Sequence, residues 1–146
     1  MVGEGRPERT VTGHHMLVVT GGPPPTNPGP LPRHDLVIAA DSGAEHAPAL
    51  GLTVDVLVGD MDSVDPTLLA DLETAGCRIE HHPVDKDETD LELALGAAIR
   101  LGATSVTVIT SAGGRPDHVM ANALTASADR WADLLIDLRI DSSRAW

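Results

Sequence analysis

The chain has 146 residues, of which 42% are hydrophobic and 22% charged, and its formal net charge at pH 7 is −12. This length and composition are typical of one globular domain with a real core. The acidic balance and the absence of Phe and Tyr argue against binding to nucleic acid or to an anionic membrane surface, since those partners need a basic face and stacking platforms.

The cellular compartment is predicted from the cysteine count and from the apolar runs. A single cysteine, Cys77, excludes an intrachain disulfide and fits a reducing compartment. The N-terminal residues contain no apolar signal-peptide region, and no apolar run approaches the ~20 residues of a membrane span. We therefore expect a cytoplasmic protein whose polar residues 1–15 are disordered or extended.

Strand and helix patterns alternate through the first half of the chain. An apolar run at residues 16–20 predicts a strand, and the six prolines between residues 23 and 32 predict an irregular connection over 21–34. Strands are predicted at 36–40 and 54–58, with a short helix at 44–50 between them. A second helix is predicted to begin at Asp65–Pro66, because an N-cap followed by proline is typical of a helix start, and to stop at Gly76.

The same alternation continues in the second half. A weaker strand is predicted at 77–80, and Thr89 with Glu92 has the form of a capping box that opens the strongest helix pattern of the sequence. This helix is predicted to end at Gly102. A strand is predicted at 105–110, then a helix from Asp117 to about residue 130, and a last strand at 134–140.

This alternation predicts an α/β fold. Strands that are apolar throughout are typical of a parallel sheet that is buried on both faces. We predict a doubly wound, mostly parallel, Rossmann-like sheet sandwiched by helices over residues 16–133. Residues 134–146 are either its final strand or the start of a C-terminal β domain.

Aspartates follow four of the predicted strands. They are Asp41, then Asp60 and Asp62 in the sequence GDMDS, then Asp85, Asp87 and Asp90, and finally Asp117. The carboxyl ends of parallel strands meet at one edge of an open sheet, where ligands bind. Each aspartate has a simpler interpretation as a helix cap or a turn residue, but capping alone hardly explains four acidic loops at one edge.

A group of carboxylates needs cations beside it. Mg²⁺ prefers carboxylate oxygens and often completes its shell with substrate phosphates. Lys86 and Arg115 are the basic residues inside these loops, and Gly113 and Gly114 would let the backbone approach a phosphate or a base. This combination suits a nucleoside triphosphate. The chain has no GxxxxGK[ST] or GxGxxG sequence, so we expect neither an ordinary P-loop kinase nor a nicotinamide enzyme, and zinc-ligand spacing is missing.

Four motifs in this order resemble those of thiamine pyrophosphokinases: ADSGA (40–44), GDMDS (59–63), DKDETDLELAL (85–95) and GGRPDHVMAN (113–122). The resemblance runs from about residue 16 to the C-terminus. It implies Mg²⁺-dependent transfer of pyrophosphate from ATP to the hydroxyl of thiamine, which gives thiamine diphosphate and AMP. The implied metal ligands are Asp41, Asp60, Asp62 and Asp90. The implied catalytic residues are Asp60, Asp62, Asp87, Asp90 and Arg115. The implied nucleotide-binding residues are Asp41, Ser42, Lys86, Thr89, Gly113, Gly114, Arg115, Asp117 and His118.

Two departures from the family pattern stand out. Thr110 occupies the position where the family's glycine loop usually opens with Gly. Members of the family continue into a second, β-rich domain that helps to form the thiamine site and the dimer, and we expect this chain to lack it. A homodimer is expected for a full-length form. Two alternatives stay open, namely a related diphosphokinase that acts on a pterin alcohol and a truncated, non-catalytic nucleotide-binding module.

Overall fold

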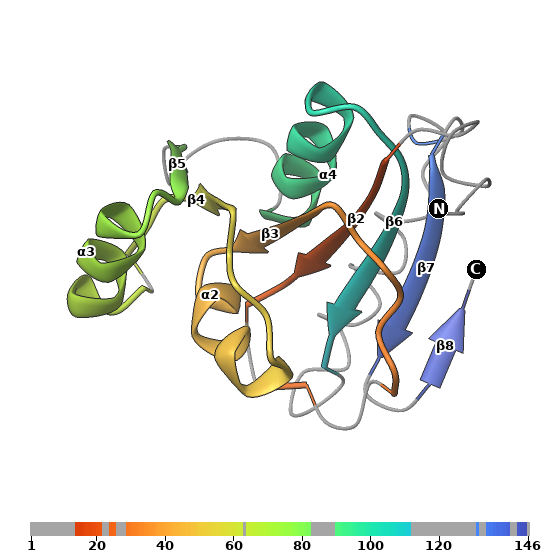
Figure 1. The fold of residues 1–146 in the computed structure, drawn as a ribbon, viewed down its shortest axis with the longest axis horizontal. Coiled ribbons are helices and arrows are strands. Elements are labelled where there is room, and N and C mark those ends of the chain that lie inside the picture. Colours follow the sequence, from red (N-terminus) through yellow and green to blue (C-terminus); the bar gives the residue numbers. More distant parts are fainter. Residues whose placement is uncertain are drawn as a thin grey trace, which may run out of the picture.

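The computed structural model describes residues 14–21, 24–25, 29–62, 64–82, 90–111, 131, 134–140 and 143–145. They form a seven-stranded sheet in the order β5-β4-β3-β2-β6-β7-β8 (Figure 1). Neighbouring strands from β5 to β7 are parallel, and only β8 runs antiparallel, beside β7. The strands are β2 (His14–Val19), β3 (Leu36–Ala40), β4 (Val56–Gly59), β5 (Arg78–His81), β6 (Ala103–Thr110), β7 (Leu135–Ile140) and β8 (Ser143–Ala145). The predicted mostly parallel α/β sheet is confirmed.

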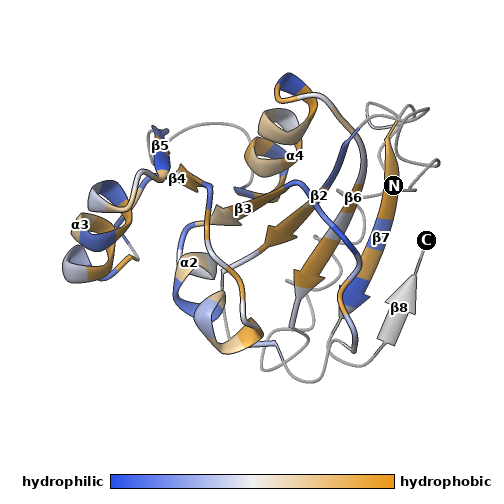
Figure 2. Ribbon diagram, viewed as in Figure 1, coloured by the Kyte–Doolittle hydropathy of each residue, from blue (hydrophilic) through white to orange (hydrophobic). Residues whose placement is uncertain are grey.

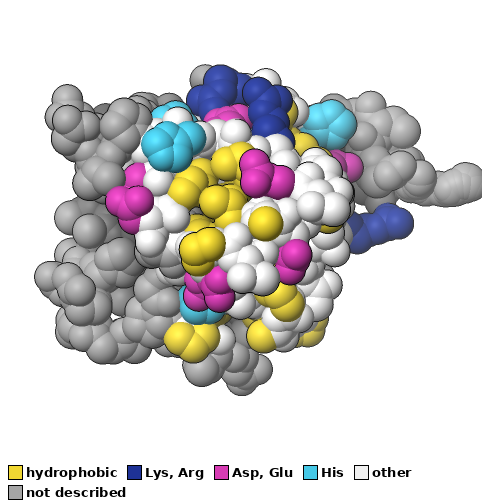
Figure 3. Space-filling model, turned by 90° about the vertical axis from the view of Figure 1, so that its left-hand side faces the viewer, with side chains coloured by type: hydrophobic (Ala, Val, Ile, Leu, Met, Phe, Trp, Pro, Cys, Tyr) yellow, Lys and Arg dark blue, Asp and Glu magenta, His cyan; other side chains and the backbone are white. Residues whose placement is uncertain are grey.

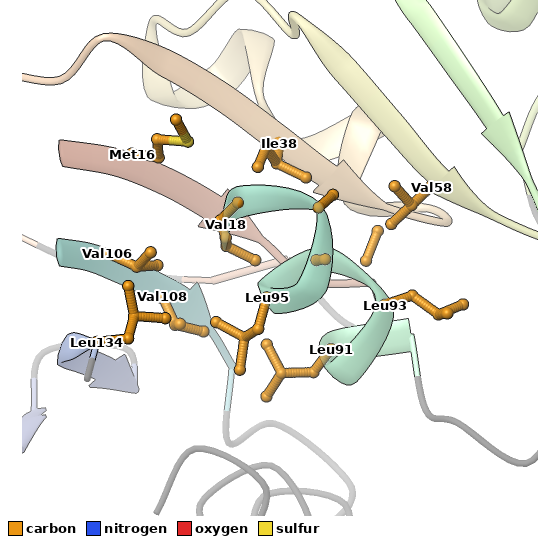
Figure 4. Packing of buried hydrophobic residues seen from close by; sticks show 14 of the residues in the cluster. Met16, Val18, Ile38, Val58, Leu91, Leu93, Leu95, Val106, Val108 and Leu134 are labelled. Carbon is orange, nitrogen blue, oxygen red and sulfur yellow. The ribbon is translucent and has the colours of Figure 1, made fainter. Parts of the chain in front are cut away.

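One face of the sheet is covered by α4 (Asp90–Arg100), which packs on β2, β3, β4 and β6. Its buried side chains include Leu91 and Leu95, which lie among Val18 of β2 and Val108 of β6 in one hydrophobic cluster (Figure 4). Side chains alternate between the two faces of a strand. The even-numbered residues of β2 and β6 therefore face α4, and the odd-numbered residues face the other side.

The other face carries α2 (Gly43–His46), a 3₁₀ turn (Pro48–Leu50) and α3 (Pro66–Thr74). The helix predicted at 44–50 is divided into two elements, because Pro48 has no N–H for the helical hydrogen-bond ladder.

The predicted start of α3 is confirmed, since the Asp65 side chain accepts a hydrogen bond from the Thr67 N–H at 2.8 Å. Gly76, with φ 94°, follows the C-cap of α3, as a left-handed helix end requires.

Residues 29–35, which lead into β3, cross the face opposite α4 and contain no helix or strand (Figure 1). A proline-rich segment offers carbonyl acceptors but few N–H donors, so donors must come from the sheet. The buried Arg139 of β7 donates from Nη1 to the Pro30 carbonyl at 2.5 Å. At the other end, the Asp35 N–H donates to the His15 carbonyl at 2.8 Å. We call residues 29–35 the strap.

Polar side chains lie on the sheet beneath the strap. The His15 ring lies between the Ser105 and Thr107 hydroxyls, at 2.6 and 2.9 Å, and Arg139 donates from Nε to Asp137 at 3.1 Å. Figure 2 shows these hydrophilic positions at the start of β2 and along β7, whereas the middle of the sheet is hydrophobic. The prediction of strands that are apolar throughout is therefore wrong for β7, because the strap needs hydrogen-bond donors from it.

The β5 edge of the sheet carries charged side chains, which discourage pairing with another strand. Arg100 Nη2 donates to Glu80 Oε1 at 2.6 Å, and Arg78 Nε forms an ion pair with Glu80 Oε2 at 3.3 Å. Figure 3 views the molecule from the side of α3 and β5 and shows basic side chains gathered at one margin, above mixed apolar and acidic ones.

Some predicted elements cannot be compared with the structure. The N-terminal segment before residue 14, the Thr89 cap and the helix predicted at 117–130 lie outside the described residues. The short strand β8 was not predicted from the sequence. Across the described residues, no helix has both the length and the hydropathy that crossing a membrane requires.

Candidate functional site

The chain order reverses between two central strands of the sheet. From β2 the chain proceeds to β3 on one side, whereas β6 lies on the other side of β2. Such a switch point opens a crevice at the carboxyl ends of the strands, where ligands of open α/β sheets bind. The switch point is polar here, because the buried Thr20 hydroxyl, directly after β2, donates to the buried Thr110 hydroxyl at the end of β6 at 2.7 Å.

Asp41 stands directly after β3 at this edge. Its φ of 49° is in the left-handed region, where Asp is tolerated better than most residues. Its N–H donates to the Val58 carbonyl of β4 at 2.9 Å. Beside it is Gly59, with φ 134°, where an added Cβ would lie only 2.9 Å from Asp41 Cγ. The glycine of GDMDS therefore makes room for the Asp41 carboxylate.

Asp60 and Asp62 belong to a tight turn after β4. Asp60 Oδ1 accepts the N–H of Asp62 at 2.9 Å, and Met61 between them has φ 72°. An aspartate that bonds to the backbone two residues ahead forms an Asx turn. The turn leaves Asp60 half-buried and Asp62 exposed, so the two carboxylates of the motif have different environments.

A third acidic side chain reaches Asp41 from α4. The pKa of Asp41 is raised to about 7, mainly by burial and also by a hydrogen bond with the Asp90 side chain and the charges of Asp90 and Asp60. A hydrogen bond from the Met61 backbone lowers the pKa of Asp41. Among the described residues, the buried Oδ1 of Asp41 has no hydrogen-bond partner. Acidic groups from three loops therefore converge here, and an unpaired buried carboxylate oxygen is an uncommon feature that a bound cation would satisfy.

The chemistry of these oxygen donors fits a hard cation such as Mg²⁺. However, within the described parts of the chain, no set of three or more His, Cys, Asp and Glu side chains has the arrangement of a metal-ligand group. The structure brings Asp41, Asp60 and Asp90 together, with Asp62 in the same turn as Asp60. Their assignment as metal ligands stays a prediction.

The remaining predicted site residues are divided between the described and undescribed parts of the chain. Ser42 follows Asp41 and occupies the N-cap position of α2, without a side-chain capping bond. The other predicted residues lie outside the described residues: Asp85, Lys86, Asp87, Thr89, Gly113, Gly114, Arg115, Asp117 and His118.

Two features of this edge were not found from the sequence. An added Cβ at Gly43 would lie 2.8 Å from the Val19 carbonyl carbon, so Gly43 lets the start of α2 approach the end of β2. The Thr20–Thr110 pair was also missed. The available signal was a threonine at the end of two apolar strands, but their pairing depends on strand order, which the sequence does not display.

The chain was compared with known proteins. The family model described as "Thiamin pyrophosphokinase, catalytic domain" matches residues 31–131. A curated thiamine pyrophosphokinase from Bacillus subtilis (strain 168) is 31% identical over 108 residues, which cover 72% of this chain and 50% of that protein. The present chain therefore spans about half the length of this relative.

Solved structures show the same similarity. A thiamin pyrophosphokinase family protein from Enterococcus faecalis superposes with a TM-score of 0.65 at 28% identity, over 86% of this chain and 60% of that one. Thiamine pyrophosphokinase from Bacillus subtilis has a TM-score of 0.67 at 26% identity, over 85% and 59%. The Candida albicans enzyme, at 14% identity and a TM-score of 0.64 over 86% and 58%, shares the fold alone.

Proposed function

This chain belongs to the thiamin pyrophosphokinase family through its catalytic domain, and we propose that it binds ATP with Mg²⁺ and transfers pyrophosphate to the hydroxyl of thiamine. The observation that carries this proposal is the group of acidic side chains around Asp41, at the carboxyl ends of the strands. In the described part of the chain, Asp41 Oδ1 is buried without a hydrogen-bond partner and the pKa of Asp41 is raised, and both features favour binding of a cation.

The proposed metal ligands are Asp41, Asp60, Asp62 and Asp90. When bound, Mg²⁺ would neutralise charge on the phosphate oxygens of ATP. Asp60 Oδ1 accepts a hydrogen bond from the Asp62 N–H. This bond orients the Asp60 carboxylate and leaves its other oxygen for a ligand. The proposed phosphate contacts of Lys86 and Arg115 rest on the sequence pattern.

The reaction is an in-line displacement at the β-phosphorus. The thiamine hydroxyl oxygen forms a bond to this phosphorus and gives its proton to a nearby carboxylate, while the bond to the α–β bridging oxygen breaks and AMP leaves. Negative charge therefore grows on the α-phosphate. Arg115 is proposed to stabilise that charge, together with the dipole at the start of α4. Asp87, Thr89, Gly113, Gly114, Asp117 and His118 are proposed to hold the nucleotide, with Ser42.

The partners of the whole protein are part of the proposal. Because the chain spans only about half of the curated relative, turnover of thiamine and a homodimeric assembly are proposed for the complete protein. The crevice at the Thr20–Thr110 switch point is proposed as the donor nucleotide site. A cytoplasmic location is proposed from the single cysteine, which fits a reducing compartment.

One assay tests the function and its alternatives, namely formation of AMP from ATP and Mg²⁺ with thiamine or a hydroxymethylpterin as acceptor. AMP formation that depends on thiamine is the expected result. If AMP forms only with the pterin alcohol, the acceptor is the pterin alcohol and not thiamine. If calorimetry shows Mg²⁺-dependent ATP binding without AMP from either acceptor, the chain is a nucleotide-binding module. No binding of ATP at all would contradict the proposal.

A further inference from the structure

The start of α3 is capped by residues from two distant segments. Asp65 is the N-cap, and its Oδ1 accepts the Thr67 N–H at 2.8 Å. In a complete capping box, a Glu or Gln three residues later accepts the N–H of the N-cap residue. That position here is Leu68, which has no acceptor. Instead, Glu45 Oε2 of α2 accepts the Asp65 N–H at 3.0 Å. The capping box is therefore completed from another element.

This hydrogen bond joins the two acidic loops of the candidate site. Glu45 lies four residues after Asp41, in the short helix that begins at Gly43. Asp65 ends the segment that contains Asp60 and Asp62. A second contact reinforces the link, because the buried Val64 belongs to the same hydrophobic cluster as Ala44 of α2 and Ala47, the C-cap of α2.

The segment between β4 and α3 needs such an anchor. Met61 is held in the left-handed conformation, which is unfavourable for a residue with a side chain and persists only when the surroundings impose it. Within the segment, the Val64 N–H donates to the Met61 carbonyl at 3.3 Å. The described hydrogen bond that ties the end of this segment to α2 is the one from Asp65 to Glu45.

We propose that Glu45 is a positioning residue that holds the Asp60–Asp62 turn at the correct place relative to Asp41. The proposal rests on the proposed function, because the positioned carboxylates are its metal ligands. Glu45 acts through the Asp65 backbone and is not itself a ligand. Preorganisation of ligand atoms determines how tightly a cation is held, so loss of this hydrogen bond should weaken the Mg²⁺-dependent part of ATP binding.

The informative comparison is between Glu45→Gln and Glu45→Ala. Both variants remove the same negative charge, but the glutamine amide oxygen can still accept the Asp65 N–H. We expect Glu45→Ala to bind ATP about 3- to 10-fold more weakly than Glu45→Gln with Mg²⁺, as expected for one net hydrogen bond. With EDTA in place of Mg²⁺, the two variants should bind ATP equally. Glu73→Ala, at an exposed carboxylate of α3, controls for loss of a surface charge.

Hydrogen exchange supplies a readout that does not depend on nucleotide. The Asp65 amide should exchange faster in Glu45→Ala than in Glu45→Gln. Equal ATP affinities of the two variants with Mg²⁺ would overturn the positioning role, and so would equal exchange. Wild type could bind no ATP with Mg²⁺ while the Asp65 amide still exchanges faster in Glu45→Ala than in Glu45→Gln. That result would contradict the proposed function but would support the link between the two loops. Denaturation curves of both variants show whether each is folded at the assay temperature.

Discussion

Gly59 lies so close to the Asp41 side chain that a Cβ at position 59 would be 2.9 Å from Asp41 Cγ. The two residues end neighbouring parallel strands, and the Asp41 N–H donates to the carbonyl of Val58. The glycine of the GDMDS motif therefore has a steric function. It allows β4 to end beside the carboxylate that follows β3, which brings two acidic loops together.

The first prediction concerns this contact. Gly59→Ala should lower the free energy of unfolding by about 2 kcal/mol or more, because it combines an unfavourable φ with a collision. It should also weaken Mg²⁺-dependent ATP binding, since Asp41 must move. Gly76→Ala is the matched control, because Gly76 also has a positive φ but nothing lies within 4 Å of its added Cβ. Urea denaturation and calorimetry measure the two effects, and unchanged ATP binding in Gly59→Ala would contradict the prediction.

The second prediction concerns the two carboxylates of the turn. Asp60→Asn and Asp62→Asn should each reduce Mg²⁺-dependent ATP affinity by about tenfold or more, because an amide oxygen is a weaker, uncharged ligand for a hard cation. Asp71→Asn, on an exposed position of α3, makes the same charge change away from the site. If both variants bind ATP as wild type does, the metal assignment is wrong.

The features that the sequence predicted well are those with local causes. The strand at Leu36–Ala40 is a continuous apolar run and matches the prediction. The start of α3 was also found, because an N-cap bond joins residues only two positions apart. Parallel strands direct the loops that follow them to one edge, so the convergence of Asp41, Asp60 and Asp90 could be expected before any side chain was placed.

The features that escaped prediction depend on contacts between distant residues. The Glu45 bond to Asp65 spans 20 positions, and the His15 contacts with Ser105 and Thr107 span about ninety. Such pairs become visible only once strand order is known. The burial of Arg139 in β7 escaped prediction for the same reason, because it depends on a hydrogen bond to the distant Pro30 carbonyl of the strap.

The third prediction follows from the pKa of Asp41, which burial and the neighbouring Asp90 and Asp60 raise to about 7. Between pH 4 and 7 the folded state therefore binds more protons at Asp41 than the unfolded state does. Without metal, the contribution of Asp41 to the free energy of unfolding should fall as pH rises through this window. Asp41→Asn should flatten this dependence, and Mg²⁺ should restore stability above pH 7 in wild type by replacing the proton. Urea denaturation at several pH values, with and without Mg²⁺, measures this. An identical pH slope in Asp41→Asn would refute the assignment.

The fourth prediction concerns His15 beneath the strap. Burial lowers the pKa of His15, and His34 and Arg139 act in the same direction, whereas Asp137 and Asp35 raise it. The folded state therefore binds fewer protons at His15 than the unfolded state does near the unperturbed pKa of about 6.5. The stabilisation that neutral His15 provides is complete above that pH, and it should be lost as pH falls through 6.5 towards the lower pKa of the folded state.

His15→Gln tests this effect, because glutamine keeps hydrogen-bonding groups for the Ser105 and Thr107 hydroxyls but cannot titrate. The variant should lose less stability than wild type between pH 7 and pH 5. Asp41 titrates with the opposite sign in this range, so the comparison is made in an Asp41→Asn background, where the His15 contribution stands alone. Parallel pH profiles of Asp41→Asn and the double variant Asp41→Asn/His15→Gln would show that His15 carries no pH dependence. A steeper loss in Asp41→Asn alone is the expected result, because only that protein must charge an imidazole that burial keeps neutral.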